Sequence, residues 1–194
     1  MAAKKINNNF IRPLAIIVVI AVIITIWVIH DHNHPEILKT RTYTSTQYNF
    51  KVAFPGTPTT SQKSKTLDGI SANTTFISSS IDNGSQHFEI YASNLPQIAS
   101  YDALNTTQKY AALTTGVNSA ITVLLSATAI TSSKTTYLGY PAIETQFRTL
   151  FKNRNINGYS RVFVIGQSDY LLLSTGATKT NFLNFANSFK YTGN

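Results

Sequence analysis

The chain has 194 residues, contains no cysteine and carries a net charge of +8 at pH 7, from 16 Lys and Arg against 8 Asp and Glu. The lack of cysteine excludes both a disulfide-stabilised scaffold and a lipoprotein anchored through a lipidated cysteine. From residue 43 onward, eleven basic and six acidic residues leave a net charge of +5. That charge is too sparse for a nucleic-acid-binding domain, so no nucleic acid is expected as a partner.

The segment 10–29 predicts a transmembrane helix. Twenty helical residues at ~1.5 Å each span roughly 30 Å, the thickness of the hydrocarbon core of a bilayer. Fourteen of these twenty residues are Ile, Val, Leu or Phe, and the one charged residue, Arg12, is near the start, where its side chain can reach the headgroups. The exit of the segment offers no small-residue cleavage site. The pattern therefore favours an uncleaved anchor over a cleaved signal peptide.

The charges beside this segment predict its orientation. Lys4, Lys5 and Arg12 come before or at the start of the apolar run, and no further basic residue follows until Lys39. Because positively charged flanks stay in the cytoplasm, residues 1–9 are expected to form a cytoplasmic tail. Everything after the helix is then extracytoplasmic, on a single-pass protein of a bacterial cell membrane that contacts the lipid bilayer through residues 10–29.

Residues 30–42 are polar and predict a juxtamembrane linker. The linker contains three alternating histidines with two acidic neighbours: His30, His32, His34, Asp31 and Glu36. Imidazoles with carboxylates suit zinc, copper or nickel. An extended linker does not preorganise ligands, however, so the three histidines are weak candidates for metal ligands, and no cofactor is expected.

The remaining residues, 43–194, predict one extracytoplasmic domain that opens with strands. In the segment 48–54 every second residue is apolar, as in a half-buried strand: Tyr48, Phe50, Val52 and Phe54. A polar hairpin is expected from residues 59–66 and 70–79. Asn83-Gly84 then predicts a hairpin turn into a strand over residues 86–92.

A long helix is expected in the middle of the domain. Ser100 can cap a helix that starts near Tyr101. The apolar residues that follow recur at intervals of three and four, which predicts one buried helix face: Leu104, Tyr110, Ala111, Leu113, Val117, Ile121 and Leu124.

Four strands and a closing helix complete the expected order. The strands cover residues 128–137, 142–151, 159–165 and 170–174, and Asn157-Gly158 predicts the hairpin turn before the third of them. The last two strands are apolar on both faces, which is typical of the centre of a sheet. Thr178 or Thr180 is expected to cap a helix that continues to Phe189. This order predicts an α+β domain with a mainly antiparallel sheet flanked by helices.

Taken together, these elements resemble the PsbP-like family. The features that carry the resemblance are the opening strand Tyr48-x-Phe-x-Val-x-Phe-Pro55, the helix in mid-chain, the sequence Leu138-Gly139-Tyr140-Pro141-Ala142, two hydrophobic strands and a closing Ser188-Phe189. The resemblance covers about residues 43–192 and implies an antiparallel sheet between helices. It also implies a non-enzymatic binding or assembly role and supplies no catalytic residues. This chain departs from the lipoprotein members of the family because a protein segment replaces the lipidated cysteine.

One group of polar residues is a candidate catalytic face. His87, Glu89 and Tyr91 alternate along one strand, and the sequence allows them to share a groove with Glu144 and Arg148. This gives an alternative function as a cell-envelope hydrolase that uses the face of His87, Glu89 and Glu144. No nucleophile is marked, and pairing of charges across strands is the simpler explanation.

A second group of residues is a candidate binding surface. Four basic residues lie within fourteen positions with no acid among them: Arg148, Lys152, Arg154 and Arg161. Outside a bacterial membrane, their partners would be anionic lipid headgroups, an anionic envelope polymer or an envelope protein. The simpler interpretation is a solvated hairpin that is kept soluble by its charges.

The sequence therefore favours a membrane-anchored, extracytoplasmic, non-enzymatic binding or assembly module of a bacterial cell envelope. A subunit of an export or conjugation complex is a further alternative. The outer domains of such subunits place helices ahead of the sheet, whereas this domain opens with strands.

Overall fold

The computed structural model describes residues 40–67, 70–94, 99–151 and 153–193. The expected cytoplasmic tail, the transmembrane helix and the three linker histidines (His30, His32 and His34) lie outside the described residues. Among the residues described, no helix is both long and apolar enough to cross a membrane.

Ten strands and three helices make up the described part of the chain. The main sheet contains β3 (Thr59–Leu67), β4 (Ile70–Ile81), β5 (Gln86–Asn94), β6 (Thr128–Tyr137), β7 (Tyr140–Phe151), β8 (Arg154–Ile165) and β9 (Ser168–Thr175). A smaller sheet contains β1 (Thr40–Ser45), β2 (Phe50–Pro55) and β10 (Lys190–Tyr191). The helices are α2 (Ala99–Asp102), α3 (Thr106–Leu125) and α4 (Lys179–Asn187).

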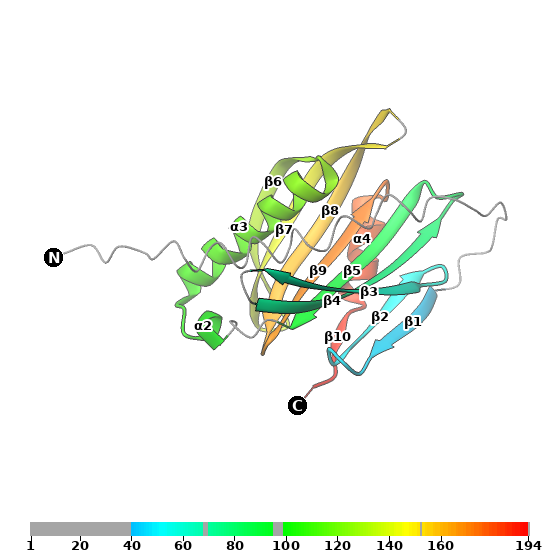
Figure 1. Cartoon of the computed structure of the whole chain (residues 1–194). Helices are drawn as coiled ribbons and strands as arrows, with labels where there is room; N and C mark the ends of the chain where they lie inside the picture. Colours follow the sequence, from blue (N-terminus) through cyan, green and yellow to red (C-terminus); the bar gives the residue numbers. More distant parts are fainter. Residues whose placement is uncertain (1–39, 68–69, 95–98, 152, 194) are drawn as a thin grey trace.

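Helices and the small sheet lie on the two faces of the seven-stranded main sheet (Figure 1), and each face carries a hydrophobic core cluster. Its strand order is β3-β4-β5-β9-β8-β7-β6, and every neighbouring pair is antiparallel. Helix α3 packs on one face, over β6, β7 and β8. Helix α4 and the three-stranded sheet cover the other face. The expected α+β class and the antiparallel sheet flanked by helices are thereby confirmed.

The alternation of apolar residues in β2 fixes which side of that strand faces the core. Phe50, Val52 and Phe54 are fully buried, whereas Lys51 between them is exposed. The ring of Phe54 lies 5.0 Å from the ring of Phe185 in α4, and the ring of Phe50 lies 5.3 Å from that of Phe189. One face of β2 therefore joins the small sheet, the end of the chain and α4 into one core.

The mid-chain helix begins five residues later than the sequence suggested. Tyr101 belongs to the short helix α2, and α3 starts at Thr106. Asn105 is the true cap of α3: its side-chain oxygen accepts a bond from Gln108 N at 3.0 Å, and Gln108 Oε1 accepts one from Asn105 N at 3.0 Å. This reciprocal capping box satisfies two backbone donors that a cap at Ser100 would leave unpaired. Leu113, Val117 and Ile121 are buried as expected.

The expected hairpin turn at Asn157-Gly158 is wrong, because both residues lie inside β8. The chain reverses direction earlier, where Asn153 adopts the positive φ of 61° that a tight turn requires. Gly158 has a different role, since a Cβ atom at this position would lie 2.1 Å from Cζ of Phe147 on the neighbouring strand. The glycine makes room for the phenyl ring that covers it.

The domain begins slightly earlier and closes later than the sequence suggested. Strand β1 starts at Thr40, so its first three residues belong to the domain and not to the linker. Thr178 caps α4 as expected, but the helix ends at Asn187, and Phe189 is buried just beyond it. The residues after Phe189 form β10, which pairs with β2.

Candidate functional site

One end of the main sheet gathers the exposed basic hairpin, two chain turns and the start of the described chain. At this end β7 passes to β8, with Phe151 paired to Arg154. Gly158 of β8 pairs with Thr175 at the end of β9, and Thr175 in turn pairs with His87 near the start of β5. The end of β9 and the start of β5 therefore lie beside the base of this hairpin. We call this the hairpin end; it includes the β7–β8 hairpin, the β4–β5 turn and the junction of β9 with α4. Figure 1 shows the β7–β8 hairpin projecting beyond the other strands.

A glycine ties these turns together. Gly176, directly after β9, has a φ of 73°, and its N–H donates to the carbonyl of Asn157 at 2.9 Å. A Cβ atom on Gly176 would lie 2.0 Å from the carbonyl oxygen of Ser85 in the β4–β5 turn. Only glycine fits this contact and this backbone conformation without strain. The base of the projecting hairpin is thus held against the neighbouring turn.

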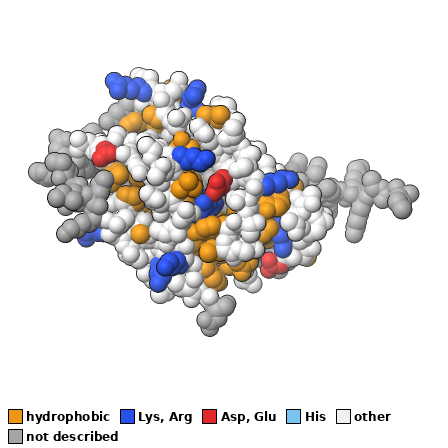
Figure 2. Space-filling view, turned by 180° about the vertical axis from the view of Figure 1, so that it is seen from behind, with side chains coloured by type: hydrophobic (Ala, Val, Ile, Leu, Met, Phe, Trp, Pro, Cys, Tyr) orange, Lys and Arg blue, Asp and Glu red, His pale blue; other side chains and the backbone are white. Residues whose placement is uncertain are grey.

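Most of the charged side chains at the hairpin end are basic. Arg148 and Arg154 are exposed on the hairpin, and Lys179 is exposed at the start of α4. Asp82 is the exposed acidic residue of the described chain at this end. Figure 2 shows basic and hydrophobic side chains together at the top of the molecule, over the hairpin. Lys152 of the predicted surface lies outside the described residues.

The tip of the hairpin also exposes a large apolar side chain. Leu150 is 68% exposed, more than any other large hydrophobic residue of the described chain. It is on the same face of β7 as Arg148, two residues earlier, because side chains alternate along a strand. An exposed leucine on the same face as Arg148, with Arg154 on the other face of the hairpin, gives this tip both charge and hydrophobic character. The sequence singled out Arg148 and Arg154 of this surface but neither Lys179 nor Leu150.

Arg161 does not belong to this exposed surface, so the predicted patch is corrected at that position. Only 5% of Arg161 is exposed. Its Nη2 donates to Glu144 Oε1 at 2.6 Å, and its Nη1 donates to Asn187 Oδ1 at 2.9 Å. The guanidinium also stacks over the ring of Tyr137, 4.3 Å from the centroid. The residue is a buried link between the sheet and the end of α4, and each of its three side-chain nitrogens already donates a hydrogen bond.

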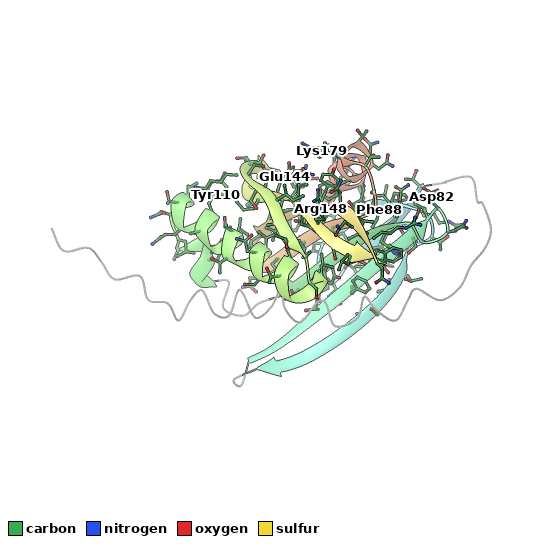
Figure 3. All side chains as sticks on the ribbon, turned by 90° about the horizontal axis from the view of Figure 1, so that it is seen from above. Asp82, Phe88, Tyr110, Glu144, Arg148 and Lys179 are labelled. Carbon is green, nitrogen blue, oxygen red and sulfur yellow. The ribbon has the colours of Figure 1, made fainter. Side chains whose placement is uncertain are left out.

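The predicted catalytic face is divided by the sheet. Glu89 and Tyr91 point to the face covered by α3, whereas Glu144 pairs with Arg161 on the face covered by α4. Figure 3 shows the sheet between α3, which carries Tyr110, and α4, which carries Lys179. His87 lies on the Glu89 side, with its Nδ1 at 2.7 Å from Ser80 Oγ and its ring against Phe151. The expected groove shared by these residues and Glu144 is therefore not formed.

Two acids on the α3 side are held in poorly solvated positions. Tyr91 donates to Glu89 Oε2 at 2.9 Å, and burial raises the pKa of Glu89 to about 7. Ser93 Oγ donates to Asp169 Oδ1 at 2.6 Å, and burial raises the pKa of Asp169 to about 6. The hydrogen bonds stabilise the charged forms but do not offset the loss of solvation. Sequence alternation placed Glu89 on this face, but nothing in the sequence marked Asp169.

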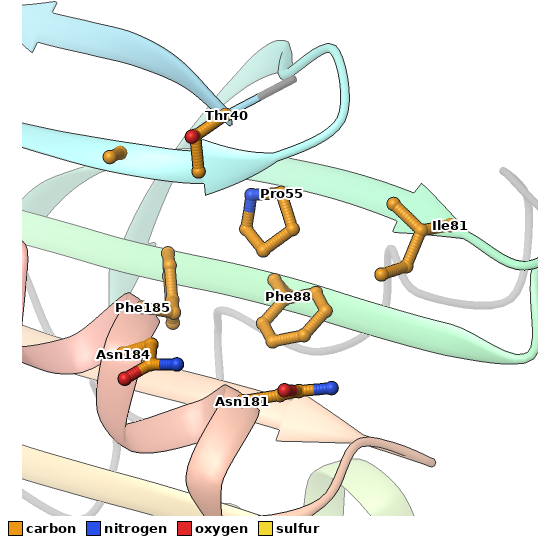
Figure 4. A pocket seen from close by; sticks show the side chains of 8 residues that line it. Thr40, Pro55, Ile81, Phe88, Asn181, Asn184 and Phe185 are labelled. Carbon is orange, nitrogen blue, oxygen red and sulfur yellow. The ribbon is translucent and has the colours of Figure 1, made fainter. Parts of the chain in front are cut away.

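A small hollow opens between β2, β5 and α4, also at the hairpin end. Its volume is about 230 Å³, and Figure 4 shows Phe88, Phe185 and Pro55 beside two amide side chains, those of Asn181 and Asn184. Pockets for drug-sized ligands measure about 300 to 1,000 Å³. The hollow is thus smaller than such pockets, and its lining is largely apolar. Its position beside Thr40 adds a recess to the same end of the domain.

Solved structures provide the comparison for this fold. The chain is similar to the solution structure of cyanobacterial PsbP (CyanoP) from Synechocystis sp. PCC 6803, with a TM-score of 0.53 and 14% identity over 84% of this chain and 98% of that chain. It is also similar to a Pseudomonas aeruginosa protein of unknown function, with a TM-score of 0.31 and 10% identity over 76% of this chain and 89% of that chain. No family model and no curated sequence matches the chain. The likeness to cyanobacterial PsbP concerns the fold alone, and on that basis the described domain has a PsbP-like fold.

Proposed function

We propose that this chain is a membrane-anchored, extracytoplasmic module of a bacterial cell envelope that binds an anionic envelope component and performs no catalysis. Residues 10–29 hold it in the bilayer, and the hairpin end is its binding surface. The observation that carries the proposal is the projecting hairpin, which exposes Arg148 and Leu150 on one face and Arg154 on the other.

Two further observations support this proposal. The PsbP-like fold is consistent with a binding or assembly module. In addition, Gly176 connects the base of the hairpin to the β4–β5 turn, and Arg148 lies at that base, paired across the strands with Asn157. Preorganised groups lose less conformational entropy on binding than groups on a free loop.

The binding function is tested with the full chain in nanodiscs of neutral phosphatidylcholine. The probe is poly(glycerol phosphate), a soluble polyanion, titrated at low and at high salt. We expect binding at low salt that weakens as salt screens exposed charges, since the screening length falls below ~10 Å above 0.1 M. Arg148→Ser combined with Arg154→Ser should weaken low-salt binding severalfold.

The matched control is Lys51→Ser combined with Lys190→Ser. These two exposed lysines face each other near the start of β2, away from the hairpin, and the change in net charge is the same. The control variant should bind like the parent. Equal binding by the parent and the hairpin variant, or no binding by either, would contradict the proposal.

The anchored location is tested separately in intact spheroplasts. Protease added from outside should remove the domain after about residue 35 and leave a small fragment in the membrane. Release of an intact soluble domain without protease, with a new N-terminus between about residues 25 and 40, would show cleavage and exclude the anchor.

A further inference from the structure

We propose that the hairpin end docks on anionic lipid headgroups of the same membrane that anchors the chain, with Leu150 entering the interface. This inference rests on the proposed function and deepens it, because it names the anionic partner and the orientation of the domain. It follows from where the chain enters the domain, how short the linker is, and which side chains lie at the hairpin end.

The described chain begins at the hairpin end. Thr40 pairs with Pro55, and the carbonyl of Pro55 accepts a hydrogen bond from Ser79 Oγ at 2.7 Å. Ser79 is two residues before the end of β4, which leads into the β4–β5 turn. The 39 residues that precede Thr40 are therefore attached at this end of the domain and not at the opposite one.

The expected linker is no longer than the longest strands of the main sheet, which have 12 residues and span about 40 Å. Residues 30–39 number ten, and ten residues span at most about 33 to 36 Å when fully extended. A tether of this length keeps the end to which it is attached within reach of the bilayer, whereas the opposite end can lie farther away. The β7–β8 hairpin projects at that same end, so it is the part of the main sheet best placed to meet the headgroups (Figure 1).

The side chains at the hairpin end favour a lipid surface over a soluble polyanion as the binding partner. Arg148 and Arg154 are exposed and are attracted by either partner. Leu150 is 68% exposed, and it contributes to the free energy of binding only when the interface removes its side chain from water. A lipid surface satisfies both requirements, whereas a hydrophilic polymer satisfies only the first. Anionic lipid is therefore the partner that these residues favour.

The experiment places one fluorescent probe at either end of β7 in the full chain. Because the sequence has no cysteine, a single introduced cysteine takes an environment-sensitive label at one known position. Leu150→Cys and Leu138→Cys form a matched pair, since both leucines are exposed and Leu138 lies in the β6–β7 turn at the opposite end. Each labelled chain is reconstituted in vesicles with phosphatidylglycerol or with phosphatidylcholine alone.

In phosphatidylglycerol vesicles we expect the fluorescence emission of the label at position 150 to shift to shorter wavelength. Spin-labelled lipid should quench it at least twofold more strongly than the label at position 138. Adding Arg148→Ser and Arg154→Ser to the Leu150→Cys chain should remove most of this difference, whereas Lys51→Ser and Lys190→Ser should not. The difference should also be lost in phosphatidylcholine vesicles.

Equal quenching at the two positions in phosphatidylglycerol vesicles would overturn the lipid inference. If the chain then still bound poly(glycerol phosphate) through Arg148 and Arg154, the proposed function would stand with a polymer as partner. Loss of both signals would overturn the inference and the proposed function together.

Discussion

Glu89 is a carboxylic acid in a position where its charged form is poorly solvated. The side chain is 4% exposed, and burial raises its pKa from 4.5 to about 7. The folded state therefore keeps a proton that the unfolded chain releases at lower pH. Between these two values the unfolded state binds fewer protons, so the free energy of unfolding falls as the pH rises and levels off above about pH 7.

Replacing the acid by its neutral isostere should remove this pH dependence. At 1.36 kcal/mol per pKa unit, the parent should lose about 2 to 3 kcal/mol of stability between pH 5 and pH 8 through Glu89. Glu89→Gln should lose much less, because its side chain does not titrate, and should be the more stable protein at pH 8. Urea denaturation of residues 40–194 at both pH values measures the difference.

Asp102→Asn provides the control for this measurement. Asp102 is an exposed acid at the end of α2, so the variant should show the pH dependence of the parent. Parallel stability curves for Glu89→Gln and the parent would mean that Glu89 is ionised in the folded protein at neutral pH. The titration of Asp169, whose pKa is raised to about 6, remains in all three proteins.

Arg161 shows where residue-level prediction from the sequence fails. Its spacing from Arg148 and Arg154 indicated a common basic surface, because charge along the chain is visible in the sequence. Its burial depends on Asn187 and Tyr137, which are more than twenty residues away in either direction along the chain. Only the fold brings these partners together. Leu150 was missed because an alternating pattern does not reveal that the end of a strand projects beyond the elements that cover the sheet.

At the scale of single elements, periodicity predicted the strands well and predicted their ends less well. β6 was expected over residues 128–137 and has those bounds. The turn of the β7–β8 hairpin was misplaced because Asn-Gly is a strong turn signal. Gly158 is instead required by the ring of Phe147, a cross-strand contact that local sequence does not show. A turn signal in the sequence therefore does not fix the position of a turn when a cross-strand contact requires the same glycine inside a strand.

The start of α3 provides a test at this scale. Asn105 Oδ1 accepts a hydrogen bond from the backbone N–H of Gln108, so Asn105→Ala removes the partner of that donor in the first turn. We expect a loss of about 1 kcal/mol in the free energy of unfolding. Asn118→Ala is the matched control, because Asn118 is exposed within the same helix, where alanine is favourable. Urea denaturation of both variants should show destabilisation for Asn105→Ala alone, and equal stabilities would exclude a role for the cap.

For the whole molecule, the order of strands and helices was sufficient to predict the α+β class. The apolar character of both faces of β8 and β9 also predicted their place, because they lie in the interior of the main sheet. The three-stranded second sheet was not predicted. Its outer strand β1 is mostly exposed and polar, and β10 has only two residues, so neither produces a pattern in the sequence.

The boundary of the domain gives a prediction at the same scale. Residues 40–194 should fold cooperatively in water without detergent, because the described core needs neither a disulfide nor a membrane segment. Removing Thr40–Thr42 takes away half of β1 and its pairing with Pro55, Phe54 and Ala53. We expect residues 43–194 to be less stable by about 1 to 3 kcal/mol.

Urea denaturation of the two fragments side by side measures this loss. Identical midpoints would show that the first half of β1 contributes nothing to the domain. A broad, non-cooperative transition of residues 40–194 would show that the domain depends on a segment or partner outside it.

The pairing of β10 with β2 has a consequence for how the domain is made. Strand β2 is near the start of the domain, yet its second neighbour comes from the last residues, where Thr192 N also donates to the carbonyl of Asn49 at 2.7 Å. Under the proposed topology, the chain crosses the membrane with its C-terminus last. One edge of β2 then stays unpaired until β10 has crossed the membrane. The small sheet can therefore form completely only after residues 190–192 have crossed, later than the strands of the main sheet.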